Sequence, residues 1–236
     1  SVSCFSYFKI LCRQYFRDKG KIFALLLQPL IIGFLFSQTF SKNSSLWIAA
    51  FALILSANWF ALSLSIREII QEKNLFSSEI RKGVSPFGIL FAKLFFISSI
   101  AFFQTLICFG FLNAVLSIAV SPLWLCVAFL STILPATLLG LLASCLVKNT
   151  SQANILLPLL IIPQVILGGA LVPIDQMTTI GRMLSALIPA KYNLDCLKNL
   201  FLNVSIHSQD LIVPIILACI FYIITWRLFS ILGKAK

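Results

Sequence analysis

Charge is scarce in this sequence. Only 11% of its 236 residues are charged, while 60% are hydrophobic and the mean hydropathy is +1.02, whereas an ordinary soluble domain is roughly 25% charged. Such a chain lacks the polar side chains that would cover a soluble globule. At about 20 apolar residues per helical crossing, its length suits six crossings with their connections. The composition therefore predicts an all-α integral membrane protein, folded as one domain over residues 1–236.

The chain also has few of the groups on which metal, redox and intramembrane chemistry depend. It contains one histidine, and its seven cysteines are scattered without a CxxC pair, which argues against a zinc site or a disulfide framework. No ionisable residue stands at the centre of an apolar run, which argues against an ion-coupled carrier and an intramembrane enzyme. We therefore predict no catalytic residue, metal or cofactor in this chain. Cys196 alone falls in a segment expected outside the membrane, and a disulfide between subunits stays open there.

Uncharged runs mark the membrane spans. The longest run covers residues 94–147, and its 54 residues are too many for one crossing and right for two, with a turn near residues 113–122. In residues 1–21, basic side chains recur at a spacing of four, which predicts an amphipathic helix at the membrane interface. The other spans are expected at residues 22–40, 46–66, 151–174 and 211–232.

The basic residues are distributed unequally between the two sides of these spans. Fourteen of the 18 lysines and arginines fall on the side that holds both termini, and only Lys42, Arg182, Lys191 and Lys198 fall on the other. Cytoplasmic loops carry the excess of basic residues, so both termini are predicted to be cytoplasmic, in a plasma (inner) membrane. The clustering also points to lipid headgroups and not to nucleic acid as the partner of the positive charge.

The charged segment at residues 67–93 is the part of the chain expected to couple transport to a cytoplasmic energy source. No group within the membrane could couple transport to an ion, so uphill movement would need a cytoplasmic ATPase. The segment combines charged pairs, Phe76 and a Gly-Ser-Pro return, which predicts a short helix parallel to the membrane that a motor domain could push. The alternative is a solvated loop of alternating charge.

Two stretches of the chain resemble the type-two permease fold of ABC exporters, most closely the G-subfamily (White-like) and its bacterial relatives. The first reads REIIQEKNLFSSEIRKGVSPFGILFAK (67–93) and resembles the second-span exit and coupling helix of that family. The second reads LGGALVPIDQMTTIGRMLSALIPAKYNLDCLKNLFLN (167–203) and resembles its broken fifth helix with an external re-entrant element, expected here at residues 175–210. Residues 1–21 are similar to its connecting helix.

The resemblance implies a function and partners. It implies the membrane part of an ATP-driven exporter that moves a hydrophobic or amphipathic compound by alternating access. The chain has no GxxxxGK[ST] motif, so ATP and Mg are expected on a partner ABC ATPase, either fused or separate. Because the chain starts at Ser1 and not at Met, an ATPase domain upstream is one expectation. A second copy of the membrane domain would complete the pathway.

The resemblance also assigns roles to particular residues. Contact with the ATPase is assigned to Glu72, Phe76, Glu79 and Arg81. Ion pairs that transmit movement at the base of the spans are assigned to Arg67, Glu68 and Lys93. The substrate cavity is assigned to polar and aromatic residues of the first, second and fifth spans, Gln28, Asn58, Phe60 and Gln164, for which hydrogen bonding between helices is the alternative. An outer gate is assigned to Leu167, Gly168 and Gly169.

Two other readings remain open. One is a separately encoded permease for haem or polysaccharide export. The other is a membrane scaffold or assembly factor without transport activity, in which the basic amphipathic start would only anchor the chain to headgroups.

Overall fold

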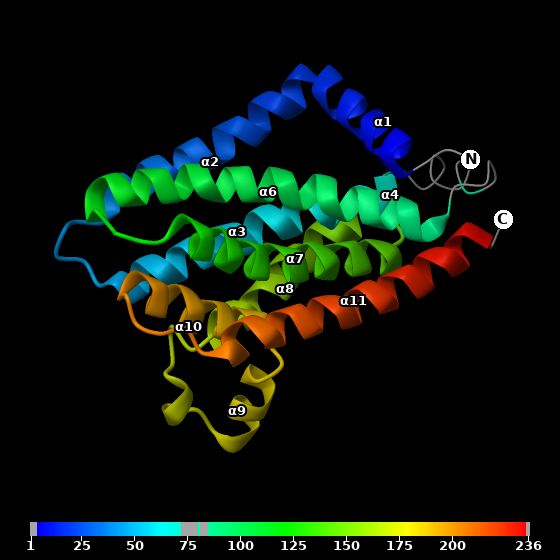
Figure 1. Ribbon diagram of the computed structural model, residues 1–236. Coiled ribbons are helices and arrows are strands. Elements are labelled where there is room, and N and C mark those ends of the chain that lie inside the picture. Colours follow the sequence, from blue (N-terminus) through cyan, green and yellow to red (C-terminus); the bar gives the residue numbers. More distant parts are fainter. Residues whose placement is uncertain (1–3, 72–79, 81–84, 235–236) are drawn as a thin grey trace.

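The computed structural model describes residues 4–71, 80 and 85–234 and places helices along most of their length. Six helices within these ranges are long and apolar enough to cross a membrane, which confirms the predicted number of spans. They run side by side, with both termini at one end of the bundle, called the terminal end below (Figure 1). The spans are α2 (Lys19–Thr39), α3 (Leu46–Ser65), α6 (Pro86–Leu116), α7 (Pro122–Leu146), α8 (Thr150–Leu167) and α11 (Ser208–Lys234).

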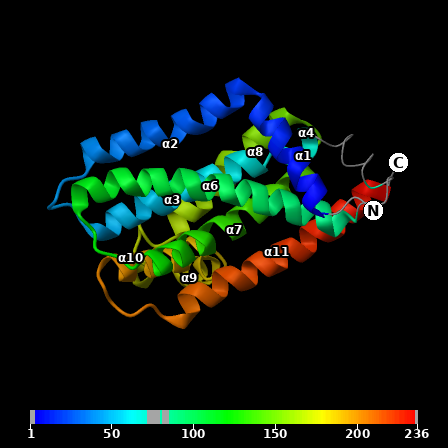
Figure 2. The ribbon, with the colours of Figure 1, turned by 45° about the horizontal axis from the view of Figure 1, so that its top comes forward.

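The N-terminal segment forms a separate helix, α1 (Cys4–Arg17), that meets α2 at a corner (Figure 2). Asp18 makes this corner because its Oδ1 accepts hydrogen bonds from the backbone N–H groups of Gly20 and Lys21, at 3.1 and 3.2 Å. A side-chain acceptor at this position satisfies backbone donors that the first turn of a helix leaves without partners. α1 then packs on α6, where the ring of Phe8 contacts Phe95 and Phe96 edge-on, at 5.6 and 5.9 Å between centroids.

The centre of the bundle is the contact between α3 and α7. Most of the apolar residues on one side of α3 are fully buried, among them Ala50, Leu53 and Ala61. Small side chains let two helices approach closely, which is a common way of packing helices in a membrane. Gly140 on α7 lies directly against Ser65 on α3, where a Cβ atom would overlap the serine hydroxyl. α8 and α11 pack at the edge of this pair, α2 packs on α6, and all three leave most of their surface exposed.

The third span begins earlier than the sequence predicts. Ser85 caps α6 by accepting a hydrogen bond from the N–H of Gly88 at 3.1 Å, and Pro86 occupies the first helical position, where a missing N–H has no cost. Lys93 was expected at the mouth of a span starting at residue 94. It lies instead two turns inside the helix and is fully buried.

The segment after α8 builds the end of the bundle remote from the termini. α8 ends at Leu167, and Gly169 has φ +87°, a backbone conformation that favours glycine. A short 3-10 turn η1 (Ile174–Gln176) and the helix α9 (Thr179–Ser185) follow. The helix α10 (Pro189–Phe201) then packs against α3, α7 and α11 (Figure 1). The fifth run was predicted to break near Gly168, and α8 ends there, with Gly168 directly after its last residue. The return of the chain into the outer leaflet stays a prediction.

Two glycines test the close contact between α3 and α7. We expect Gly140→Ala to destabilise the protein by about 1–3 kcal/mol, because Ser65 would have to leave its hydrogen bond to the carbonyl of Ala61. Gly110 on α6 is the matched control, since no atom lies within 4 Å of a Cβ built there. Gly110→Ala is expected to leave the melting temperature unchanged or to raise it, because alanine favours helix. Thermal unfolding of both purified variants in the same nanodiscs measures the difference, and equal melting temperatures would contradict the close contact.

Candidate functional site

A cavity of about 530 Å³ opens between α2, α3 and α8. Its wall also includes α1 and a short helix, α4 (Glu68–Gln71), that continues the direction of α3 toward the terminal end (Figure 1). The volume lies in the range of ligand pockets, roughly 300–1,000 Å³. Polar and charged side chains contribute a substantial part of its lining: Tyr15, Lys21, Gln28, Ser63, Arg67, Glu68, Gln71 and Asn154.

The lining residues fall at helical spacing. On α3 and just beyond it, Trp59, Ser63 and Arg67 follow one another at steps of four residues. On α2, Lys21 and Gln28 stand seven residues apart, so they share one face of the helix. Charged groups therefore lie at the terminal end of the cavity, and Trp59 and Gln28 lie deeper along the spans. Of the residues assigned to the cavity from the sequence, only Gln28 lines it.

A buried ion pair lies beside this cavity. The Nζ of Lys93 is 2.9 Å from the Oε1 of Glu68, and the two side chains are 0% and 5% exposed. The hydroxyl of Tyr15 donates to the other carboxylate oxygen of Glu68 at 2.7 Å. Buried charges are stable only when paired and hydrogen-bonded, so this cluster holds α1, α4 and α6 to one another. We call Tyr15, Glu68 and Lys93 the base cluster.

A fourth helix holds α4 from the other side. The hydroxyl oxygen of Ser144 on α7 accepts hydrogen bonds from the backbone N–H groups of Ile69 and Ile70, at 3.0 and 3.2 Å. These are donors that the first turn of α4 leaves without partners inside the helix. Because Glu68 precedes them directly, Ser144 holds the backbone from which its carboxylate extends. The base cluster is thus attached to α7 as well as to α1 and α6.

The family of the chain follows from a match over most of its length. The family model described as "ABC-2 type transporter" matches residues 3–202. The chain belongs to the ABC-2 type transporter family. Membrane domains of this family are transport components and are not catalytic themselves. Together with the six apolar helices, the match makes this chain a multi-pass integral membrane protein and the membrane component of an ABC-type transporter. No individual curated protein matches the chain.

The residues expected to contact the ATPase of this ABC-2 transporter, Glu72, Phe76, Glu79 and Arg81, lie outside the described residues. Their neighbour Ile80 is described and is partly buried against the apolar cluster that includes Leu11 of α1 and Phe96 of α6. Ile80 therefore lies close to the base cluster, because Phe96 follows Lys93 by one helical turn and its ring contacts that of Tyr15, with 4.8 Å between centroids.

The three residues assigned to transmission are not all brought together. Glu68 and Lys93 form the ion pair, whereas the exposed Arg67 turns to the cavity and donates from its guanidinium to the carbonyl of Ser63 at 3.3 Å. One residue along a helix changes direction by about 100°, so both side chains border the cavity but only that of Glu68 reaches Lys93. Tyr15 was not among the residues assigned to transmission. The available signal was its position on the apolar face of α1, which packs against the bundle.

Asn58, Phe60 and Gln164 are buried inside the protomer and do not line the cavity. Their exposed fractions are 2%, 0% and 5%, and the amide of Gln164 donates to the carbonyl of Leu160 in its own helix at 3.2 Å. Polar side chains in a span turn inward because hydrocarbon offers them no partners. A role in binding substrate is a prediction that needs another conformation to expose them.

The residues assigned to an outer gate lie where α8 ends. The carbonyl of Leu167 accepts a hydrogen bond from the hydroxyl of Ser185 at 2.7 Å, which ties the end of α8 to α9. A Cβ atom on Gly168 would meet the carbonyl oxygen of Gln164, so this position requires glycine on steric grounds. Their function as a gate stays a prediction.

Cys196 is fully buried in α10, and burial raises the pKa of its thiol to about 12, with the carboxylates of Asp210 and Asp195 adding to the effect. A thiol that is buried and protonated cannot reach or attack a partner. A disulfide between subunits at this cysteine would therefore need another conformation, in which the thiol is exposed.

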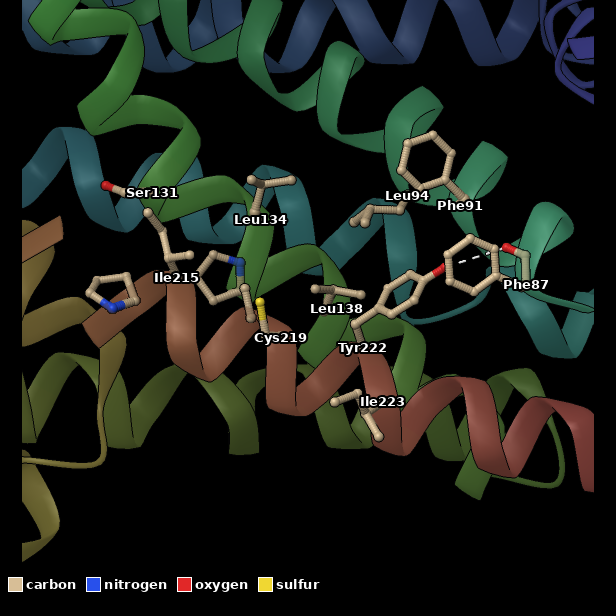
Figure 3. A pocket seen from close by; sticks show the side chains of 13 residues that line it. Phe87, Phe91, Leu94, Ser131, Leu134, Leu138, Ile215, Cys219, Tyr222 and Ile223 are labelled. Atoms are coloured by element: carbon tan, nitrogen blue, oxygen red, sulfur yellow. Dashed lines mark hydrogen bonds between the residues drawn. The ribbon is translucent and has the colours of Figure 1, made fainter. Parts of the chain in front are cut away.

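A second hollow of about 480 Å³ lies between α6, α7 and α11 (Figure 3). Phe87, Phe91, Leu134 and Ile215 line it, and Tyr222 closes one end by donating its hydroxyl to the carbonyl of Phe87 at 3.4 Å. Its wall is almost wholly apolar, so it offers no group that would orient a ligand. The cavity beside the base cluster is the better candidate for a site.

The base cluster can be tested by a double-mutant cycle. Glu68→Gln is expected to destabilise the protein by about 3–5 kcal/mol, because it leaves the buried Lys93 without its counter-charge. Glu68→Gln with Lys93→Gln is expected to lose less than the sum of the single changes. The free energy of unfolding in a fixed lipid or detergent system measures this coupling.

Arg67→Gln is the matched control for this cycle, because Arg67 is the exposed neighbour of Glu68 and lies outside the base cluster. We expect its effect on stability to stay within about 0.5 kcal/mol. Strictly additive effects of the Glu68 and Lys93 changes would contradict a direct ion pair.

Proposed function

We propose that this chain is the membrane half of an ATP-driven exporter that moves a hydrophobic or amphipathic compound by alternating access. Within the ABC-2 family, the nearest group in this proposal is the G-subfamily with its bacterial relatives. The single observation that carries the proposal is the position of the cavity, which shares Glu68 with the base cluster. A movement of the charged segment after α4 would therefore reach the wall of the cavity directly.

The base cluster offers a physical route for that movement. The partner ATPase, with its bound ATP and Mg, would push on the cytoplasmic segment between α4 and α6. Glu68 belongs to α4 and Lys93 to α6, so the ion pair clamps the two ends of this segment together. Tyr15 links the same carboxylate to α1. A displaced segment would thus carry α1, α3 and α6 as one unit. α2 would move with them, because it packs along α6 and its Leu25 carbonyl accepts a hydrogen bond from Gln104, while α8 could separate from this unit.

A second copy of the membrane domain is part of this proposal. α8 carries a stripe of exposed apolar side chains at steps of three or four residues, Ile155, Leu159, Ile162 and Ile166, each 48–69% exposed. Such a stripe suits either lipid or a helix of another subunit. Because α8 also forms one wall of the cavity, pairing along α8 would bring the cavities of two copies together. Both termini lie on the cytoplasmic side in this arrangement.

Co-purification tests the transporter function. We expect a stoichiometric ABC ATPase to purify with the chain, and its ATPase activity in lipid to fall severalfold with Phe76→Ala or Glu79→Ala. The matched control is Asp175→Ala, because Asp175 is an exposed acid of the segment after α8. A complex without an ATPase would contradict the proposal and favour a scaffold.

The transmission role of the base cluster has its own test. Tyr15→Phe removes one hydroxyl donor to a carboxylate, an interaction worth about 1.5–3 kcal/mol, and leaves the ion pair in place. We expect this variant to fold and to hydrolyse ATP, with stimulation by transported compounds reduced by about fivefold or more. Tyr192→Phe is the control, since it removes the same hydroxyl group at a site away from the base cluster, where it donates to the carbonyl of Ala186. Equal stimulation in both variants would rule out transmission through Tyr15.

A further inference from the structure

We infer that the cavity between α2, α3 and α8 binds amphipathic anions, with the anionic group beside Lys21 and Arg67 and the apolar body beside Trp59 and Leu157. This inference rests on the proposed function, since it names the class of compound that the exporter would take. It depends on the charge and the depth of the groups that line the cavity.

The cavity carries an excess of positive charge. Lys21, Arg67 and Glu68 are the charged residues of its wall. Both carboxylate oxygens of Glu68 are engaged, one by Lys93 and one by Tyr15. Its negative charge is therefore compensated by Lys93, which is not part of the wall. Among the residues that the structure describes, neither Lys21 nor Arg67 forms an ion pair.

Both basic groups have hydrogen-bond donors to spare. The Nζ of Lys21 lies 5.3 Å from the centre of the Tyr15 ring, a contact with a ring face that uses no acceptor. The guanidinium of Arg67 donates to one backbone carbonyl, and a guanidinium has five N–H donors. Asp18 is the nearest acid along the chain to Lys21, but its Oδ1 accepts from two backbone N–H groups at the start of α2. An anion in the cavity would thus find donors that no carboxylate of its wall occupies.

The rest of the wall suits an apolar body. Trp59 is 39% exposed, although its neighbours Asn58 and Phe60 are buried, so its ring is presented to the cavity. Leu25, Leu64 and Leu157 complete this part of the wall. Gln28 lies seven residues beyond Lys21, a rise of about 10 Å along a helix. A compound with an acidic group at one end and about 10 Å of hydrocarbon or ring system fits this order of groups.

Cations of the same shape would be opposed by two positive charges, and a sugar would leave Trp59 and the leucines without apolar contact. An anionic bilayer lipid shares the chemistry of the inferred ligand. The test therefore uses nanodiscs of phosphatidylcholine alone, to which anionic probes are added.

Two fluorescent probes of matched size separate the effect of charge from that of apolar contact. 4-(1-Pyrenyl)butyrate and (1-pyrenylbutyl)trimethylammonium carry the same ring system with opposite charges. Binding to the purified transporter is measured by energy transfer from tryptophan to pyrene, and Trp59→Phe identifies the part of the signal that comes from the cavity. We expect the anion to bind about tenfold more tightly than the cation, as charge-assisted hydrogen bonds imply.

Charge removal at the cavity should abolish this preference. Lys21→Gln and Arg67→Gln are each expected to weaken binding of the anion by about three- to tenfold and to leave the cation unaffected or bound more tightly. Arg227→Gln is the matched control, because Arg227 is an exposed basic residue on α11 that lies outside the wall of the cavity. It removes the same charge from the protein and should not change the preference.

Equal binding of both probes, or an equal loss with Arg227→Gln, would overturn the inference and leave Lys21 and Arg67 as anchors for headgroups. ATPase activity separates this failure from that of the proposed function. Stimulation by both probes alike would retain the exporter and reject the anion preference. Selective binding of the anion without any effect on an associated ATPase would support the binding site and contradict the exporter.

Discussion

The ion pair between Glu68 and Lys93 is the interaction on which the terminal end of this protein depends. Two charges buried at 5% and 0% exposure would destabilise the fold if either lost its partner. The pair therefore requires α4 and α6 to stay in register, and the hydroxyl of Tyr15 and the Ser144 bonds to α4 extend this requirement to α1 and α7. Four segments that are distant in sequence meet there. One wall of the cavity belongs to this unit, and the other walls belong to α2 and α8, whose side chains are mostly exposed.

The membrane spans could be predicted because the bilayer imposes them on the sequence. A run without charge reports the thickness of the hydrocarbon core almost directly, so α3 and α7 were expected within a few residues of their ends. Lys93 escaped this logic. A lysine at the edge of an apolar run predicts the boundary of a span. Lys93 lies inside the helix instead, because the buried carboxylate of Glu68 pairs with it. This pairing joins residues 25 positions apart and cannot be predicted from the run alone.

The wall of the cavity was harder to predict than the spans. Asn58 and Trp59 are adjacent, but the asparagine faces the interior and the tryptophan faces the cavity. In spans that are apolar all round, hydrophobicity does not indicate which face is buried. The signal for the wall of the cavity was helical spacing. Trp59, Ser63 and Arg67 stand four residues apart, and Lys21 and Gln28 stand seven residues apart. These polar and aromatic residues recur on one side of each of two consecutive spans, toward the terminal end.

The burial of Lys93 has a consequence for biosynthesis. A lysine at depth in a lone helix opposes insertion by about 2.5–3.5 kcal/mol at the bilayer centre and by less near its edge. Because α3 and α4 precede α6 in the chain, Glu68 is synthesised before Lys93. The carboxylate that pairs with the lysine in the folded protein is thus made before the helix that carries the lysine. The order in which the helices are made is part of what allows this charge to be buried.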